Sequence, residues 1–431
     1  MPSILLCSSP FASHLAPTLA VARAFLDEDW RVRVLTGGRF ADWISDVGAE
    51  PVVLPPEADF PPRAGAEPVS SAPRGIKAMN DIIYDTFYAP ADAQFRAICA
   101  AIDDEPVDVV GGDPSFTGML LLNSLPERPV VAVASFLPLL ISTSETAPFG
   151  TGLPPRSGWT GMLRNRAMDW FIRRMALRSV HRRIDRLFRA HGLSGLGRAF
   201  MFDYFVHPGL VDLYGQFSAP SFEYPRSRLP SIVRFFGPVA PLLPTSPGLP
   251  AWWPDLDDGR PVVHVTQGTV ANSDLDELIR PTLEALEDEE VLVVVSTGGV
   301  DTSGIEPALP LNARAAPWLP YALLLPKLAV LVTNGGYGGI TAALTCGVPI
   351  VAGGDTQDKV ETAARVGWSG VGINLRTGHP TPDAIRRAVR AVLTDPSYRL
   401  AAERIADESA SLPGAVGFVT AVDSLTGRVE P

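Results

Sequence analysis

The chain has 431 residues, 46% of them hydrophobic, and a formal net charge of −11. This length exceeds what one hydrophobic core organises, so we expect two domains of roughly 200 residues each. The acidic balance argues against a nucleic-acid partner. Three cysteines without pairing or metal-ligand spacing favour a reducing, cytoplasmic location and no metal site. No apolar run approaches the ~20 residues of a membrane-spanning helix, and no signal peptide is visible.

The amino-terminal half alternates expected strands and helices. The segments Ser3 to Ser8 and Arg31 to Thr36 are typical of buried strands, and Pro17 is expected to begin a helix that ends at Leu26. This β-loop-α-β order predicts a doubly wound α/β domain. His14 lies in the loop expected before the helix. An imidazole there is either a helix cap or a general base that works near neutral pH.

A carboxylate follows a later strand of the same domain. The run Val107 to Val110 predicts a strand, and Asp113 comes just after it, so it is expected at the same sheet edge as His14. A carboxylate that holds the far nitrogen of an imidazole orients the ring and stabilises its charged form. Asp113 is therefore either such a partner or the cap of a helix predicted over Phe116 to Leu122.

An arginine-rich segment, residues 158–191, has the spacing of amphipathic helices. Nine arginines there are opposed only by Asp169 and Asp185. A basic amphipathic helix can lie on an anionic membrane surface. We favour instead a solvated basic face whose apolar stripe lines a pocket, because the rest of the chain is acidic and shows no lipid anchor.

The second half is organised around a glycine-dense turn. The turn lies between an apolar run, Leu328 to Val332, and a short predicted helix, Ile340 to Cys346, and a second apolar run follows from Val348 to Ala352. Strand, turn, helix and strand in this order predict a βαβ unit. Glycines let the backbone approach a ligand, and the free N–H groups of a new helix favour an anion such as phosphate. The turn consists of Asn334, Gly335, Gly336, Tyr337, Gly338 and Gly339.

These motifs resemble the donor-binding signature of the nucleotide-sugar-dependent glycosyltransferases that include plant secondary-metabolite and bacterial macrolide enzymes. The resemblance is carried by the Asn-Gly-Gly turn, by Gly347-Val348-Pro349, by the acidic Asp358 and by Asp395-Pro396. It covers essentially the whole chain, most strongly the second half. It implies the GT-B architecture, an α/β fold in which two Rossmann-like doubly wound domains face a cleft.

The resemblance also implies how the chain is divided. Residues 1–237 would form an acceptor-binding domain, residues 238–258 a linker, residues 259–410 the donor-binding domain, and residues 411–431 a terminal helix that crosses back to the first domain. A sugar would move from a UDP- or dTDP-sugar to a small lipophilic natural product, with inversion and without metal or cofactor. A homodimer is compatible with this reading.

Individual roles follow only from the resemblance. His14, in His14-Leu15-Ala16-Pro17, stands where the family keeps its catalytic base, and Asp113 stands where it keeps the orienting aspartate. Trp318 stands where an aromatic ring stacks on the nucleobase. This chain has Lys359 and Tyr321 at two positions where many relatives have glutamine. The implied donor-binding residues are Gln267, Gly268, Thr269, Trp318, Leu319, Asn334, Gly335, Gly336, Tyr337, Gly338, Gly339, Asp358 and Lys359.

Two other functions stay open at this point. One is a nucleoside-diphosphate-sugar 2-epimerase on the same architecture, which needs acidic and basic residues around the bound sugar. The other is a catalytically silent protein that stabilises a true transferase, although an intact His14 and an intact glycine turn speak against it.

Overall fold

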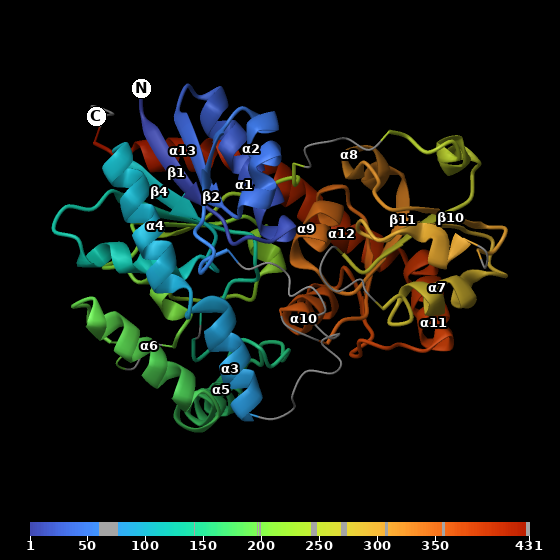
Figure 1. The fold of residues 1–431 in the computed structure, drawn as a ribbon. Helices are drawn as coiled ribbons and strands as arrows, with labels where there is room; N and C mark the ends of the chain where they lie inside the picture. The colour runs from blue at the N-terminus through green and yellow to red at the C-terminus, as the bar shows by residue number, and fades with distance from the viewer. Residues whose placement is uncertain are drawn as a thin grey trace.

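A seven-stranded parallel sheet forms the centre of the first half of the structure, a computed structural model (Figure 1). The structure describes residues 1–59, 76–141, 143–195, 197, 200–242, 248–268, 274–306, 309–355 and 358–427. Within these ranges the strands are β1 (Ser3–Cys7), β2 (Arg31–Thr36), β3 (Glu50–Val53), β4 (Val109–Gly112), β5 (Val130–Ser135), β6 (Leu213–Gln216) and β7 (Val233–Phe235). Their order across the sheet is β3-β2-β1-β4-β5-β6-β7.

A second parallel sheet, of six strands in the described ranges, forms the centre of the other half. Its strands are β8 (Val262–Thr266), β9 (Leu292–Ser296), β10 (Ala313–Ala316), β11 (Leu328–Thr333), β12 (Ile350–Ala352) and β13 (Gly372–Asn374). The order is β10-β9-β8-β11-β12-β13, so both sheets are doubly wound, as the sequence predicts.

Helices cover both faces of each sheet (Figure 1). The first domain carries α1 (Ala12–Asp27), α2 (Ala41–Val47), α3 (Ile76–Phe87), α4 (Ala91–Asp104), α5 (Gly158–Phe171) and α6 (Arg178–Ala190). The later helices are α7 (Ile279–Leu286), α8 (Tyr321–Leu324), α9 (Tyr337–Thr345), α10 (Lys359–Ser369), α11 (Pro382–Thr394), α12 (Pro396–Ser411) and α13 (Gly414–Asp423).

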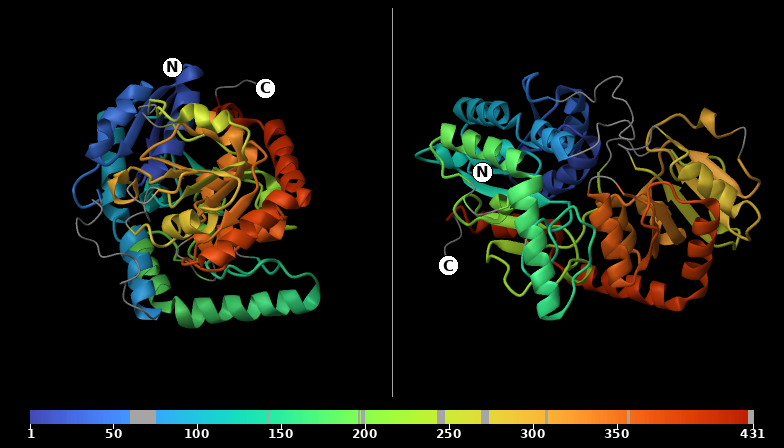
Figure 2. Two further views of the ribbon diagram at one scale, coloured as in Figure 1. Left: turned by 90° about the vertical axis from the view of Figure 1, so that its right-hand side faces the viewer. Right: turned by 90° about the horizontal axis from the view of Figure 1, so that it is seen from below.

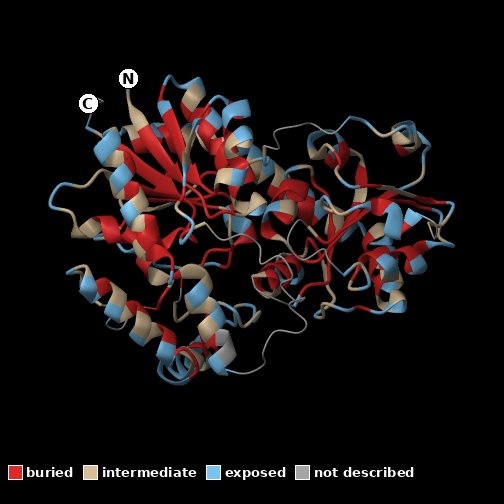
Figure 3. Ribbon diagram, viewed as in Figure 1, coloured by how far each residue is buried: buried red, intermediate tan, exposed pale blue. Residues whose placement is uncertain are grey.

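The strands are apolar along their length because they are buried on both faces. In β1, Ile4 and Leu6 pack with α1 on one side of the sheet, whereas Leu5 and Cys7 pack with α4 on the other. All four side chains have no exposed surface. Figure 3 shows the same pattern for both sheets, with exposed residues on the outer surfaces of the helices.

The last helix packs on the first domain. Phe418 of α13 contacts Phe25 of α1, with ring centroids 6.2 Å apart, and lies 5.4 Å from the ring of Phe217 and 5.3 Å from that of Phe236. Gly215 of β6 leaves room for this ring, since a Cβ there would lie 2.7 Å from Phe418. The chain therefore passes between the domains twice.

Some predicted helix boundaries differ from the structure. Helix α1 begins at Ala12 rather than at Pro17, so His14 lies in the first helical turn and not in a loop. The helix tolerates Pro17 because only the bond to the exposed Ser13 carbonyl is lost, and water can replace it. The helix predicted over Phe116 to Leu122 is a 3₁₀ helix, Thr117–Ser124, and α7 begins at Ile279, although the sequence favours a helix from Leu275.

The arginine-rich segment forms α5, a π-helical turn (Ile172–Ala176) and α6. Figure 2 shows these helices in green on the underside of the view of Figure 1. The prediction that the apolar stripe lines a pocket is wrong for α5, where Trp159, Leu163 and Trp170 are 72%, 60% and 60% exposed.

Candidate active site

His14 and Asp113 meet at the carboxyl edge of the first sheet. The Nδ1 atom of His14 lies 3.1 Å from Oδ1 of Asp113. Because a carboxylate only accepts hydrogen bonds, we assign the ring proton to Nδ1, which leaves Nε2 with a free lone pair. The His14 side chain is 20% exposed, whereas Asp113 is fully buried. The pair thus presents one basic nitrogen and hides the carboxylate behind it.

Strand order explains why these side chains meet. β1 and β4 are neighbours, with Cys7 opposite Gly112, and the chain reverses its winding direction between them. Gly112 is needed for this approach, because a Cβ there would lie 2.2 Å from the Cys7 carbonyl oxygen. Asp113 follows β4 directly, and His14 lies on the helix that follows β1.

The surroundings fix the charges of the pair. Burial opposes ionisation of Asp113, but His14 and the N–H groups of Ser9 (2.7 Å) and Ser115 (2.8 Å) outweigh it and lower the carboxyl pKa. Burial also opposes protonation of His14, yet the Asp113 carboxylate outweighs it and raises the pKa of His14 above 6.5. Asp358, from the other domain, acts in the same direction.

Two turns meet in the same way at the carboxyl edge of the second sheet, between β8 and β11. The amide of Asn334 donates a hydrogen bond to the Gln267 carbonyl and so joins them. The Gln267 side chain is buried and holds α7, accepting from the N–H of Ile279 at 3.1 Å. Gly268 adopts a φ of +74°. Thr269 lies outside the described residues.

The glycine turn is shorter than predicted, because α9 begins at Tyr337 rather than at Ile340, so Tyr337, Gly338 and Gly339 form the first turn of the helix. Gly335 has a φ of +94°, a conformation that favours glycine, and a Cβ there would lie 3.3 Å from Cβ of Lys359. Gly336 has an ordinary φ of −62°. A Cβ on Gly336, Gly338 or Gly339 would meet no atom within 4 Å. Backbone N–H groups at the start of α9 therefore border open space, and no acidic side chain lies in the first turn.

The residues expected to read the nucleobase differ in exposure. Trp318 is partly exposed and packs on the turn at Gly299, where a Cβ would lie 2.8 Å from the ring. Leu319 belongs to the core, so only its backbone is available to a ligand. The hydroxyl of Tyr321 donates to Nε2 of His264 at 3.1 Å. His264 accepts because burial lowers its pKa to about 4 and keeps the ring neutral.

Asp358 and Lys359 begin α10 and lie beside the glycine turn. Burial raises the pKa of the Asp358 carboxyl, and the charge of His14 opposes that shift, so the two groups are within electrostatic reach across the domains. Burial lowers the pKa of the Lys359 ammonium, opposed by three carboxylates of the second domain. Within the part of the chain that the structure describes, Lys359 has no side-chain hydrogen bond or ion pair.

A buried polar cluster that the sequence analysis did not find joins the two domains. Glu223 accepts a hydrogen bond from the hydroxyl of Tyr337 at 2.7 Å and pairs with Arg365 at 3.0 Å. The side chains of Glu223 and Arg365 are each 1% exposed. Gln216 donates to the same tyrosine hydroxyl at 3.2 Å. Tyr337, expected at the donor, therefore turns its side chain toward the first domain.

The same cluster holds the loop between β5 and α5. Arg365 also pairs with Glu361 at 3.1 Å. Glu361 in turn accepts hydrogen bonds from the N–H groups of Gly150 (2.9 Å) and Gly152 (2.8 Å). This loop of the first domain is thus anchored on α10, the helix that begins at Lys359.

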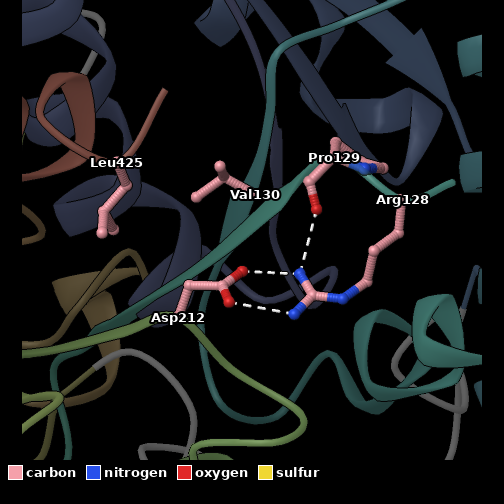
Figure 4. A pocket seen from close by; sticks show the side chains of 5 residues that line it. All are labelled: Arg128, Pro129, Val130, Asp212 and Leu425. Carbon is pink, nitrogen blue, oxygen red and sulfur yellow. Dashed lines mark hydrogen bonds and ion pairs between the residues drawn. The ribbon is translucent and has the colours of Figure 1, made fainter. Parts of the chain in front are cut away.

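A pocket of about 220 Å³ lies at the opposite, amino-terminal edge of the first sheet (Figure 4). Arg128 and Asp212 line it and satisfy each other through two hydrogen bonds, of 2.5 and 2.9 Å. Asp212 also accepts from the N–H of Val131 at 2.8 Å. Because these groups are already paired, the pocket offers little to a ligand and is not the active site.

No group of three or more metal-ligating side chains occurs among the described residues. Cys7, Cys99 and Cys346 are free thiols. No helix in the described ranges is long and apolar enough to cross a membrane.

Two doubly wound parallel-sheet domains, one carrying a histidine–carboxylate pair and the other a glycine turn before a helix, have the architecture of the two-domain GT-B glycosyltransferases. The calicheamicin glycosyltransferase CalG4 has the same fold, with a TM-score of 0.74, 22% identity and full coverage of both chains. The glycosyltransferase VinC, solved in complex with dTDP, matches with a TM-score of 0.69, 20% identity and coverage of 99% of this chain and 100% of that chain.

Sequence comparison then gives the family. Residues 281–425 match the family described as "Erythromycin biosynthesis protein CIII-like, C-terminal domain". The chain is 38% identical to 4'-demethylrebeccamycin synthase of Lentzea aerocolonigenes, over 98% of this chain and 99% of that protein. It is 31% identical to UDP-glycosyltransferase 2 of Phaeomoniella chlamydospora, over 98% and 96% of the two chains. The chain belongs to the natural-product glycosyltransferases, and it is an enzyme of that type.

Proposed function

We propose that the chain is an inverting glycosyltransferase that moves a sugar from a UDP- or dTDP-sugar to a nucleophile of a small lipophilic natural product. The observation that carries the proposal is the His14–Asp113 pair, held at 3.1 Å and within electrostatic reach of Asp358 beside the donor turn. A base from one sheet and an anion-binding turn from the other thus serve one reaction centre.

The chemistry follows from these positions. The acceptor gives its proton to Nε2 of His14 while its oxygen or nitrogen attacks the anomeric carbon. The bond from that carbon to the diphosphate breaks on the opposite face, which inverts the centre. Asp113 stabilises the imidazolium that forms. The N–H groups at the start of α9 stabilise the departing diphosphate, so neither metal nor cofactor is required in this scheme.

Names of similar proteins support the choice of donor and acceptor. UDP appears in the name of the Phaeomoniella relative, and VinC was solved with dTDP. Demethyllactenocin mycarosyltransferase of Streptomyces fradiae is 28% identical over 98% of this chain and 85% of that protein. We therefore include both nucleotides and natural-product acceptors in the proposal.

A thermal-shift panel of UDP- and dTDP-sugars identifies the donor, because a ligand stabilises the fold by RT ln(1 + [L]/Kd). Transfer is then measured by chromatography and mass spectrometry, and the anomeric configuration of the product by NMR. We expect His14→Ala to lower kcat by roughly 10²–10⁴-fold with nucleotide affinity unchanged. His207→Ala, at an exposed histidine, is the control. Near wild-type transfer by His14→Ala, a retained configuration, or epimerised donor without acceptor would contradict the proposal.

A further inference from the structure

Helix α5 and the π-helical turn after it carry an unusual concentration of exposed apolar side chains. We call residues 158–178 the arm. Its large exposed apolar residues are Trp159, Met162, Leu163, Trp170, Phe171 and Met175. Monomeric proteins rarely expose contiguous apolar surface of this kind without a function.

Trp159, Leu163 and Trp170, three of these side chains, share one face of α5. Trp159, Leu163, Arg166 and Trp170 follow one another at the three- and four-residue spacing of a helix surface. The opposite face packs inward, where Gly161 and Asn165 are buried. The exposed face is therefore a property of the helix and not of scattered residues.

The exposed charges of the arm have one sign. Arg166, Arg174 and Arg178 are exposed among the apolar side chains. Asp169, the carboxylate of this segment, pairs with Arg173 at 2.6 Å. Residues 158–191 as a whole carry nine arginines and two aspartates in a chain of net charge −11. The arm thus combines exposed tryptophan with unopposed positive charge.

We propose that the arm docks on the surface of an anionic lipid bilayer. A bilayer surface accepts both features at once, because aromatic rings settle at the headgroup level and arginines extend to anionic phosphates. A second copy fits less well: a twofold interface would place the arginines of one arm against those of the other, with no exposed carboxylate on the arm between them.

The arm is connected to the site. The amide of Asn165 donates to the Ser144 carbonyl at 3.1 Å, and Arg164 donates to the Pro154 carbonyl at 3.1 Å. Both acceptors belong to the loop that Glu361 anchors. If the acceptor is lipophilic, as the proposed function holds, docking places this loop where such a molecule partitions. The docking itself does not depend on that assignment.

The test is co-sedimentation of the full chain with vesicles of phosphatidylcholine, with and without phosphatidylglycerol. We expect binding only to the anionic vesicles, weakened by salt, together with a blue shift of tryptophan fluorescence. The variant R166Q/R174Q should bind these vesicles roughly 30-fold more weakly, because it removes two cations near the surface. W159Q/W170Q should abolish the blue shift.

The matched control is R387Q/R404Q, which removes two exposed arginines from α11 and α12. We expect it to bind anionic vesicles as the wild type does. Equal binding by all variants, or equal binding to neutral vesicles, would overturn the proposal. The proposal would also be overturned if the wild type binds no vesicles and light scattering shows that it is a dimer, whereas W159Q/W170Q is a monomer. Titration of the chain with UDP and dTDP tests the proposed function separately, because nucleotide binding does not depend on docking to vesicles.

Discussion

The buried pair between Arg365 and Glu223 allows a quantitative test of how the domains are joined. Arg365→Met removes the guanidinium but keeps an unbranched side chain of similar reach. Glu223 and Glu361 then stay buried without their hydrogen-bonded cation. Removing one partner of a buried pair costs about 3–5 kcal/mol. Because Glu223 keeps the Tyr337 hydroxyl and Glu361 keeps two N–H groups, we expect about 3–4 kcal/mol, in the lower part of that range.

This loss converts into a measurable temperature. An unfolding entropy of ~2.1 cal/mol/K per residue over 431 residues gives ~0.9 kcal/mol/K when both domains unfold together. The expected fall in Tm is therefore ~3–5 °C by scanning calorimetry. The control is Arg23→Met, in a pair with Asp27 whose side chains are 56% and 53% exposed, and it should cost at most ~0.5 kcal/mol.

A double-mutant cycle completes the test. Glu223→Gln combined with Arg365→Met should cost less than the sum of the single changes, by about 1–3 kcal/mol, because the unpaired carboxylate is removed with its partner. Additive costs, or an Arg365→Met protein as stable as the Arg23→Met control, would refute the view that this cluster stabilises the domain contact.

The remaining predictions concern the reaction centre and the glycine turn beside it. Asp113→Asn removes the charge that raises the pKa of His14, so the acidic limb of the kcat/KM profile, which reports loss of the neutral base, should move to lower pH; an unmoved limb would exclude this pairing. Gly336→Val should fold normally, since its φ is ordinary, but should weaken UDP and dTDP binding in calorimetry by filling open space; equal affinity would place the donor elsewhere. Gly335→Val should instead lower the free energy of unfolding by roughly 1–3 kcal/mol through backbone strain at φ +94°, and this loss is measured as a lower Tm. Lys359→Gln should change the ranking of sugar donors by kcat/KM at constant nucleotide affinity, and an unchanged ranking would remove Lys359 from the sugar site.

Much of the fold and part of the site could be predicted because the signals are local. The apolar runs of β1 and β11 identify buried strands, and residues that follow parallel strands meet at one edge, which brings His14 to Asp113. The cluster around Arg365 has no such signal. Glu223 lies 142 residues from Arg365 and 114 residues from Tyr337 along the chain, and only tertiary packing brings these side chains together. The side-chain direction of Tyr337 likewise depends on the other domain.

The glycine turn also shows where conformational reasoning needs coordinates. From the sequence alone, all glycines of the turn have the same expected purpose, which is to let the backbone approach a ligand. In the structure the left-handed conformation belongs to Gly335, whereas Gly336 has an ordinary φ and open space where a Cβ would lie. Gly335 is therefore required for the fold of the turn, whereas we expect Gly336 to be required for ligand binding.

The double passage of the chain between the domains has a mechanical consequence. The passages touch each other: the N–H of Gly414 donates to the Phe236 carbonyl at 2.7 Å, and a Cβ on Gly237 would lie 3.1 Å from Cβ of Leu412. Two covalent connections fixed at one place act as a pivot, so opening of the domains becomes rotation about that point rather than free separation. A truncation before Gly414 would remove half of the pivot and uncover the aromatic slot that Phe418 fills, which makes the carboxyl terminus a poor place to shorten this enzyme.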